Sequence, residues 1–252
     1  MKKKNGILIY PLLIMGLILI LVSSCENAED DEDITGTVTD MEGNVYRTVT
    51  IGTQVWMAEN LKTTKYSNGD SIETTTPTSL DISQQDSPKY QWPYDGNESN
   101  VATYGKLYSW YSITDSRNIC PSGWHVATNA DWGTLIDYLI ANGYNFDGKK
   151  AENNIGKAMA AKTNWVSSTT EGTVGNTDYP TKRNKSGFSG LPGGYRGPFG
   201  TFTAIGYSAF WWSSDEYDSD EAGVYGLGND GRGLGVGTFG KHWGASVRCV
   251  KD

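Results

Sequence analysis

The first 25 residues restrict which part of this 252-residue chain can fold. Three lysines at positions 2–4 precede an apolar run over residues 7–21, which is the charged start and hydrophobic centre of a secretory signal. The run has about 15 residues, whereas a membrane-spanning helix needs about 20. Two serines and Cys25 follow, as at the cleavage site of a bacterial lipoprotein signal. We therefore expect residues 1–24 to be removed and Cys25 to carry membrane lipid; an uncleaved transmembrane anchor is the alternative.

An acidic segment follows this cysteine directly. Residues 26–33 read Glu-Asn-Ala-Glu-Asp-Asp-Glu-Asp, and a block of like charges repels itself and cannot build an apolar core. We expect residues 25–36 to form an extended tether. The segment also resembles the signal that sends Bacteroidetes lipoproteins to the outside of the outer membrane. That resemblance implies an outward-facing, lipid-anchored outer-membrane protein, with the periplasmic face as the alternative.

Composition limits what the remaining residues 37–252 can be. The whole chain has a net charge of −8, and removal of a leader with three lysines and no acid makes it −11. Such a balance argues against nucleic acid as a partner, because phosphate is bound by cationic side chains. The length suits one domain with a real core. With 9 Trp, 15 Tyr and 31 Gly, the chain is expected to be a helix-poor, loop-rich α+β domain.

Two cysteines remain once Cys25 is acylated. Cys120 and Cys249 are an even pair in an exported chain, which predicts a disulfide that closes a loop of about 130 residues. Two buried free thiols are the alternative. Neither cysteine has a Cys or His neighbour at metal-ligand spacing, so we expect no zinc site.

Strand patterns occupy the two ends of the domain. Turn chemistry at Gly43-Asn44 separates two runs of strand formers, and alternation over residues 45–51 continues after a turn into residues 54–58, which predicts a meander. Near the other end, residues 224–227 and 234–236 flank Asn-Asp-Gly-Arg and predict a hairpin. A closing strand is expected over residues 245–250.

Helices are expected in the middle of the chain. Residues 104–112 predict a short helix, and residues 151–162 a weaker one. The strongest helix signal starts at Thr128, a good N-cap with Asp131 three residues later, and ends at Gly143. One apolar stripe runs along this helix, made of Trp132, Leu135, Ile136, Leu139 and Ile140. The polar stretch over residues 63–100 predicts a long loop held down by Tyr90, Trp92 and Tyr94.

Several separated segments resemble one known family. Taken in order, they are similar to the Fibrobacter succinogenes major paralogous domain, found in lipoproteins of Bacteroidetes and Fibrobacteres, from about residue 38 to the end. The segments are Gly43–Tyr46, Ile51–Leu61, Tyr104–Trp110, Cys120–Val126, Gly187–Arg196, Trp211–Ser214 and Ser246–Val250. Small departures are Ala127, where the family usually has proline, and Gly190, where it usually has alanine.

The resemblance implies a C-type-lectin-like fold: a small twisted antiparallel sheet, two to three short helices and long loops. Formylglycine-generating enzymes share that architecture distantly. The resemblance also implies that Cys120 and Cys249 occupy the positions of a structural disulfide. The family provides no activity that can be carried over to this chain.

The sequence displays no reaction chemistry. His125 lies in Gly-Trp-His-Val next to the predicted disulfide, where we expect a structural histidine. His242 lies in a glycine-flanked loop and has no visible acid or nucleophile partner. We expect no enzyme activity, no catalytic residue and no cofactor; a distant relative of formylglycine-generating enzymes is the remaining catalytic alternative. Five acids over residues 215–221 suggest calcium, but their spacing matches no calcium loop, so we expect a solvated acidic loop and no metal site.

Aromatic side chains are the best candidates for ligand contacts, because sugar rings stack on flat aromatic faces. Trp211 and Trp212 are adjacent on a predicted strand and must face opposite ways, one toward the core. Our candidate ligand-binding residues are Trp211, Tyr207, Tyr217, Tyr225 and Trp92. We therefore expect a non-catalytic binding module for a glycan or a surface protein. A structural or adhesin-like envelope component is the alternative, and a large flat apolar patch would favour it.

Overall fold

The structure is a computed structural model that describes Met1 and residues 34–252. Residues 2–24 of the predicted leader, the lipidation site Cys25 and the acidic residues 26–33 lie outside the described residues. Within the part that the structure describes, none of the helices is both long and apolar enough to cross a membrane.

The first sheet has five antiparallel strands and joins the two ends of the domain. Its strand order is β1-β2-β3-β13-β6. The strands are β1 (Ile34–Thr39), β2 (Val45–Ile51), β3 (Gln54–Met57), β13 (Cys249–Lys251) and β6 (Trp124–Val126). The predicted meander over residues 37–58 is confirmed. Strand β1 nevertheless begins at Ile34, which pairs with Val49, so the predicted tether boundary at residue 36 falls inside a strand.

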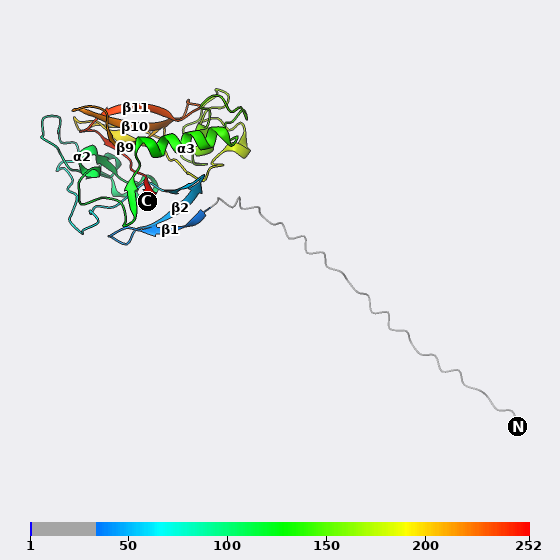
Figure 1. Cartoon of the computed structure of the whole chain (residues 1–252), viewed down its shortest axis with the longest axis horizontal. Coiled ribbons are helices and arrows are strands. Elements are labelled where there is room, and N and C mark those ends of the chain that lie inside the picture. Colours follow the sequence, from blue (N-terminus) through cyan, green and yellow to red (C-terminus); the bar gives the residue numbers. More distant parts are fainter. Residues whose placement is uncertain (2–33) are drawn as a thin grey trace. The chain divides into compact units, whose positions relative to one another are not determined.

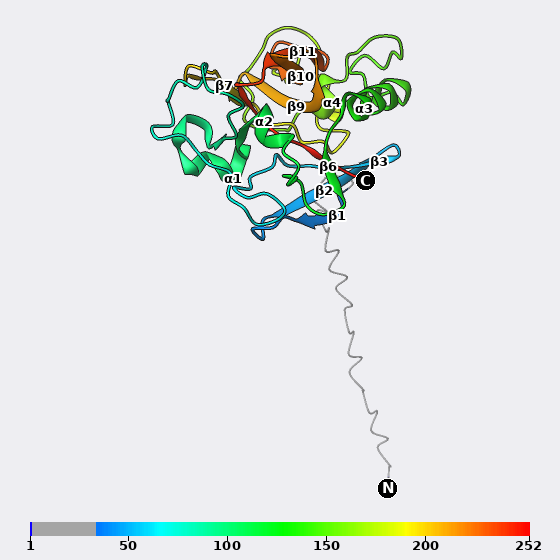
Figure 2. The ribbon, with the colours of Figure 1, turned by 60° about the vertical axis from the view of Figure 1, so that its left-hand side comes forward.

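The second sheet has eight strands and carries the glycine-rich last third of the chain. Its order is β11-β10-β9-β7-β12-β5-β4, and β8 pairs with β7. The strands are β4 (Gln91–Trp92), β5 (Leu107–Ser109), β7 (Gly193–Arg196), β8 (Phe202–Ile205), β9 (Ser208–Glu216), β10 (Glu221–Gly228), β11 (Gly235–Gly240) and β12 (Gly244–Ala245). The predicted hairpin is confirmed as β10–β11, with Gly226 opposite Gly235. Strands β9–β11 and β1–β2 lie on opposite sides of the domain (Figures 1 and 2).

Helix α3 (Asn129–Ala141) is the one long helix of the described residues. Its predicted start is confirmed: the Thr128 hydroxyl accepts from the backbone N–H of Asp131, and the Asp131 carboxylate accepts from that of Thr128. Gly143 follows the helix in the left-handed region, at φ 77°. The remaining helices are short: α1 (Val101–Tyr104), α2 (Trp110–Ile113), α4 (Gly156–Met159), and the 3₁₀ turns η1 (Tyr94–Gly96), η2 (Glu98–Asn100) and η3 (Pro180–Lys182).

Three secondary-structure predictions are wrong, two of helices and one of a strand. In each case, backbone groups form hydrogen bonds with segments that lie far away in the sequence. The helix predicted over 104–112 is interrupted by β5, which pairs with β4 and β12. The helix predicted over 151–162 shrinks to α4, because the Ala161 N–H donates to the Gly190 carbonyl. The single strand predicted over 245–250 is divided, since β12 belongs to the second sheet and β13 to the first.

Two hydrophobic clusters fill the domain, and β9 contributes to both. Trp211 lies in the cluster with the buried face of α3, where Trp132 stacks on Tyr225 at 4.9 Å between ring centroids. Trp212 lies in the cluster that contains the disulfide. The prediction that these adjacent tryptophans face opposite ways is confirmed, although both rings are fully buried. The Cys120–Cys249 disulfide is also confirmed, with 6.0 Å between the Cα atoms.

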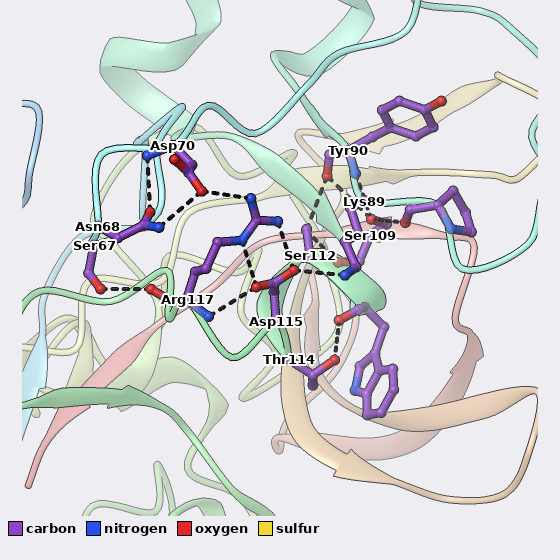
Figure 3. A network of polar contacts seen from close by, with 12 residues as sticks. Ser67, Asn68, Asp70, Lys89, Tyr90, Ser109, Ser112, Thr114, Asp115 and Arg117 are labelled. Atoms are coloured by element: carbon purple, nitrogen blue, oxygen red, sulfur yellow. Dashed lines mark hydrogen bonds and ion pairs between the residues drawn. The ribbon is translucent and has the colours of Figure 1, made fainter.

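Polar contacts hold the long stretch over residues 63–100 against the body of the domain. The Arg117 guanidinium donates two hydrogen bonds to the Asp115 carboxylate, both at 2.8 Å, and a third to Asp70 (Figure 3). The ammonium of Lys89 also donates to Asp115, and the guanidinium lies 3.9 Å over the Tyr66 ring. The Arg117 contact lowers the pKa of Asp115 well below its usual range despite the opposing effect of burial. These pairs fasten the loop at Asp70 and Lys89 to the segment after α2.

The described residues thus form a mixed α+β fold that is mostly sheet, with few short helices. This agrees with the class expected from composition.

Candidate functional site

A polar cleft of the described residues lies beside β2 and the end of β3 in the first sheet. It is a cleft of about 350 Å³ between the segment after β3, helix α1 and the chain after α4. We call it the Asn60 cleft. Its lining residues are Arg47, Ala58, Glu59, Asn60, Lys62, Val101, Ala102, Thr103, Gly105, Ala161, Lys162, Thr163, Asn164, Asn184, Ser189 and Leu191. Hydroxyl, amide and charged groups dominate this lining, and none of these residues is aromatic.

Asn60 fixes the floor of the cleft through four hydrogen bonds. Its amide nitrogen donates to the Tyr104 carbonyl at 2.8 Å and to the Ser246 hydroxyl at 3.2 Å. Its amide oxygen accepts from Trp211 Nε1 and Arg248 Nε, both at 2.8 Å. Because every polar group of this side chain is used, the floor is rigid and held in place from the core.

Gly105 allows helix α1 to approach that floor. Its φ is +72°, and a Cβ at this position would lie 2.7 Å from both the Asn60 Cβ and the Leu61 carbonyl oxygen. Any side chain here would push α1 away from the floor. The width of the cleft therefore depends on this glycine.

A fully buried cation lies directly behind the floor. The Arg248 guanidinium donates to the Asn60 amide oxygen and to the carbonyls of Met57, Phe188 and Ser189. All of these acceptors are neutral, so burial lowers the pKa of Arg248 to about 9. The residues that line the cleft thus separate the Arg248 guanidinium from the space inside it.

The rim of the cleft carries more positive than negative charge. Arg47, Lys62 and Lys162 line it together with one carboxylate, that of Glu59. Both oxygens of this carboxylate accept from Arg47, one from Nε and one from the backbone N–H. The Lys62 ammonium lies 5.0 Å over the Tyr46 ring. A net positive cleft in an acidic protein favours polar ligands that accept hydrogen bonds.

The aromatic residues that the sequence singled out do not form one binding surface. Trp211 and Trp92 are fully buried, and Tyr225 is 6 % exposed, so these three rings pack in the core and offer no face to a ligand in this structure. Tyr207 and Tyr217 are exposed, at 54 % and 71 %. These two tyrosines flank β9 at opposite ends, so they cannot contact one small ligand together.

The structure contains a different aromatic cluster, which the sequence did not indicate. The rings of Tyr195, Phe210, Phe239 and Trp243 contact one another, with Tyr195 and Trp243 stacked at 5.3 Å. An apolar groove of about 270 Å³ lies beside Phe210 and Phe239 on β9–β11, and Val236 at its edge is 67 % exposed. Strand β11 pairs only with β10 and forms one edge of the second sheet. These rings come from β7, β9, β11 and the turn before β12, so no local pattern unites them.

The acidic loop over residues 215–221 already contains a cation from the protein itself. The Lys241 ammonium donates to the Glu216 carboxylate and to the carbonyls of Asp218 and Ser219, at 2.6–2.9 Å. The same ammonium lies 4.7 Å from the Trp110 ring centroid. Oxygen atoms that could suit a metal ion therefore surround an ammonium group. Among the residues that the structure describes, His, Cys, Asp and Glu form no group of three suited to a metal.

Both histidines are held by contacts within the fold. His242 Nε2 lies 2.8 Å from the Gln85 carbonyl oxygen. His125 lies between two carboxylates, with Nδ1 2.7 Å from Asp252 and Nε2 3.0 Å from Asp131. Burial acts to lower the pKa of His125, but the hydrogen bonds to Asp252 and Asp131 outweigh it and the pKa is raised. His125 thus joins the end of the chain to the start of α3.

This arrangement predicts a pH-dependent contribution to stability. Because the folded-state pKa of His125 is raised, its stabilisation is complete below the unfolded pKa of about 6.5 and is lost as the pH rises through the folded value. The side chain is 38 % exposed, so we expect less than about 1 kcal/mol. Urea unfolding at several pH values checks this: His125→Asn should flatten the decline of stability between about pH 6 and pH 8. Parallel profiles for the wild type and the variant would refute it.

Sequence reasoning also missed the Asn60 cleft, although part of the signal was present. Ala58–Leu61, Gly105 and the Ser189–Leu191 segment all lie in stretches that carry the family resemblance. No local pattern in the sequence indicates that these three segments meet. Gly190 shows how closely they pack, since a Cβ there would lie 2.9 Å from the Trp211 ring.

Comparison with known proteins gives one match. The sequence model of the Fibrobacter succinogenes major domain matches residues 49–251. None of the curated proteins and none of the solved structures compared with the chain matches it. The match spans most of the chain and contains the whole second sheet, the disulfide, and every residue that lines the Asn60 cleft except Arg47. The chain therefore belongs to the Fibrobacter succinogenes major domain family.

Proposed function

We propose that this protein is a lipid-anchored, non-catalytic binding module of the cell envelope that holds a glycan in the Asn60 cleft. One observation carries this proposal. Three segments that resemble the family, far apart in the chain, converge on the lining of a single cleft. The Asn60 side chain at their centre is fixed from behind by Trp211 and Arg248 of the core, as a pre-formed ligand site requires.

The chemistry of the lining supports binding rather than catalysis. Thr103, Thr163 and Asn164 are exposed at the rim and can exchange hydrogen bonds with sugar hydroxyls. Histidine is the most frequent general base in enzymes, and a free thiol is the most readily activated side-chain nucleophile. His125 and His242 lie outside the cleft, and Cys120 is joined to Cys249. A catalytic relative of formylglycine-generating enzymes therefore has little support.

The finer description of the fold is part of the same proposal. The first sheet joins β1–β3 to β13 and so brings both ends of the domain together, and long loops surround a few short helices. These features are those expected of a C-type-lectin-like domain. A structural comparison with lectin-like domains after experimental structure determination tests this assignment.

A protein-binding or adhesin-like role is the second candidate. The apolar groove beside Phe210 and the unpaired edge of β11 favour it, because an edge strand presents backbone groups to another chain. A pull-down from envelope extracts that captures a partner only when β11 is intact would favour this role over glycan binding.

A glycan array with residues 26–252 tests the main proposal. Both hydrophobic clusters and the disulfide lie within this part of the chain. Ala102 is exposed on α1 and lines the cleft, so Ala102→Trp should fill the cleft and abolish binding. Ala130→Trp changes an equally exposed helix position outside the cleft and should bind as the wild type does. No bound glycan, or equal binding by both variants, would overturn the proposal.

The anchor makes a separate prediction. Cys25→Ser should move nearly all of the protein from the membrane fraction to the soluble fraction, because the acyl chains on this one side chain hold the protein on the membrane. Ser24→Ala keeps a small residue before the cysteine and should stay in the membrane fraction. Fractionation followed by immunoblotting measures both. If Cys25→Ser stays membrane-bound, the leader is an uncleaved anchor. Protease treatment of intact cells tests whether the protein faces outward from the outer membrane.

A further inference from the structure

The balance of charge around the Asn60 cleft is opposite to that of the whole chain. The chain carries a net charge of −8, yet three cationic side chains and one carboxylate line the cleft. The carboxylate of Glu59 is already paired with Arg47, at 3.3 Å between Oε1 and Nε. Within the described residues, the Lys62 ammonium makes its contact with the Tyr46 ring and with no carboxylate. The positive charge of Lys62 is therefore not cancelled by a carboxylate of the described residues.

Arg248 adds to this potential from below. Its guanidinium is 1 % exposed, is bonded to neutral oxygens alone, and touches two residues that line the cleft, Asn60 and Ser189. Charge in a low-dielectric interior acts over longer distances than charge in water. An anion in the cleft would lie over this cation with the floor side chains between them. A cation in the cleft would meet repulsion from both the rim and the floor.

Hydroxyl and amide groups surround the same space. Thr103 and Thr163 supply hydroxyls, and Asn164 supplies an amide with both a donor and an acceptor. A ligand that fits this lining carries several hydroxyls and a negative charge. A simple phosphate or acetate would use the charge but leave these groups without partners.

We infer that the ligand of the Asn60 cleft is an acidic glycan, an oligosaccharide whose sugar units carry carboxylates. The inference rests on the proposed function and names the class of glycan. The carboxylate of one uronic acid unit is attracted to Lys62, and its ring hydroxyls contact the threonines and Asn164. At physiological ionic strength, charges more than about 8 Å away are largely screened, so the local positive rim outweighs the acidic remainder of the surface.

Titration calorimetry with tri-galacturonate and its methyl ester tests the inference, because the two probes differ in charge but share the same rings and hydroxyls. Residues 26–252 should bind the acid at least about tenfold more tightly than the ester, and the difference should shrink as NaCl is raised. Lys62→Gln should weaken binding of the acid about fivefold to tenfold and leave the ester unchanged. Lys62→Arg should restore binding of the acid.

Lys150→Gln is the matched control, since Lys150 is exposed and lies outside the cleft. It should bind the acid as the wild type does. Tighter binding of the ester, or equal losses in Lys62→Gln and Lys150→Gln, would overturn the acidic-glycan inference while the binding module stands. Binding of neither probe, together with an empty glycan array, would overturn the proposed function itself. Circular dichroism of each variant confirms that the fold is intact.

Discussion

Arg248→Met is expected to destabilise the domain by at least about 3 kcal/mol. The side chain is fully buried and provides four hydrogen bonds, to Asn60 and to three backbone carbonyls. Methionine keeps much of the apolar stem but leaves those carbonyl oxygens buried without donors, and each costs about 1–3 kcal/mol. The relief from burying one charge fewer offsets only part of this loss.

Urea unfolding at pH 7 measures the effect. Arg248→Lys keeps the charge but cannot reach all four acceptors, so its loss should be intermediate. Arg232→Met is the matched control, because this arginine is exposed, and its loss should stay below about 1 kcal/mol. A loss for Arg248→Met as small as that of the control would show that this buried network contributes little to the fold.

Removing the disulfide is expected to destabilise the domain by about 4–5 kcal/mol. The Cys120–Cys249 bond joins residues 129 apart in the chain, so it restricts the unfolded ensemble strongly. Cys120→Ala/Cys249→Ala should therefore unfold at a much lower urea concentration than the oxidised wild type. Both cysteines are buried, and their replacement also removes apolar contacts in the second cluster.

Wild-type protein in a strong reductant separates the two causes of this loss. Reduction opens the loop but keeps both sulfur atoms in the core, so it should account for most of the change. Equal stability with and without reductant would contradict a major role for the disulfide. Arg248 precedes Cys249 directly, so the losses from the two sites should not simply add.

Local residue patterns were sufficient to predict α3 and β2 from the sequence. The capping residues Thr128 and Asp131 and the apolar stripe after them predicted α3 because all of those interactions are local. The alternation over residues 45–51 predicted β2 for the same reason. The helix predicted over residues 151–162 failed because Ala161 pairs with Gly190, which lies 29 positions away in the sequence.

The candidate site likewise depends on contacts between segments that are distant in the sequence. Tryptophan abundance suggested an exposed aromatic surface, but Trp211 donates to Asn60 and lies fully in the core. A large ring in a pattern of strand formers does not reveal which face is covered, because a loop or helix from elsewhere covers it. The half-exposed rings of Tyr195, Phe210 and Trp243 meet only after β7, β9 and the turn before β12 are assembled.

The sequence by itself determined the α+β class, the family, the pairing of Cys120 with Cys249, the start of α3 and the strands that flank short turns. These features depend on residue type, on spacing along the chain, or on a count of cysteines. The tertiary structure alone decided that Asn60, Gly105 and Ser189 line one cleft, and that Arg248 lies buried behind it. The physical reason is that burial and the direction of a charge depend on contacts between distant segments, which only the packed sheets bring together.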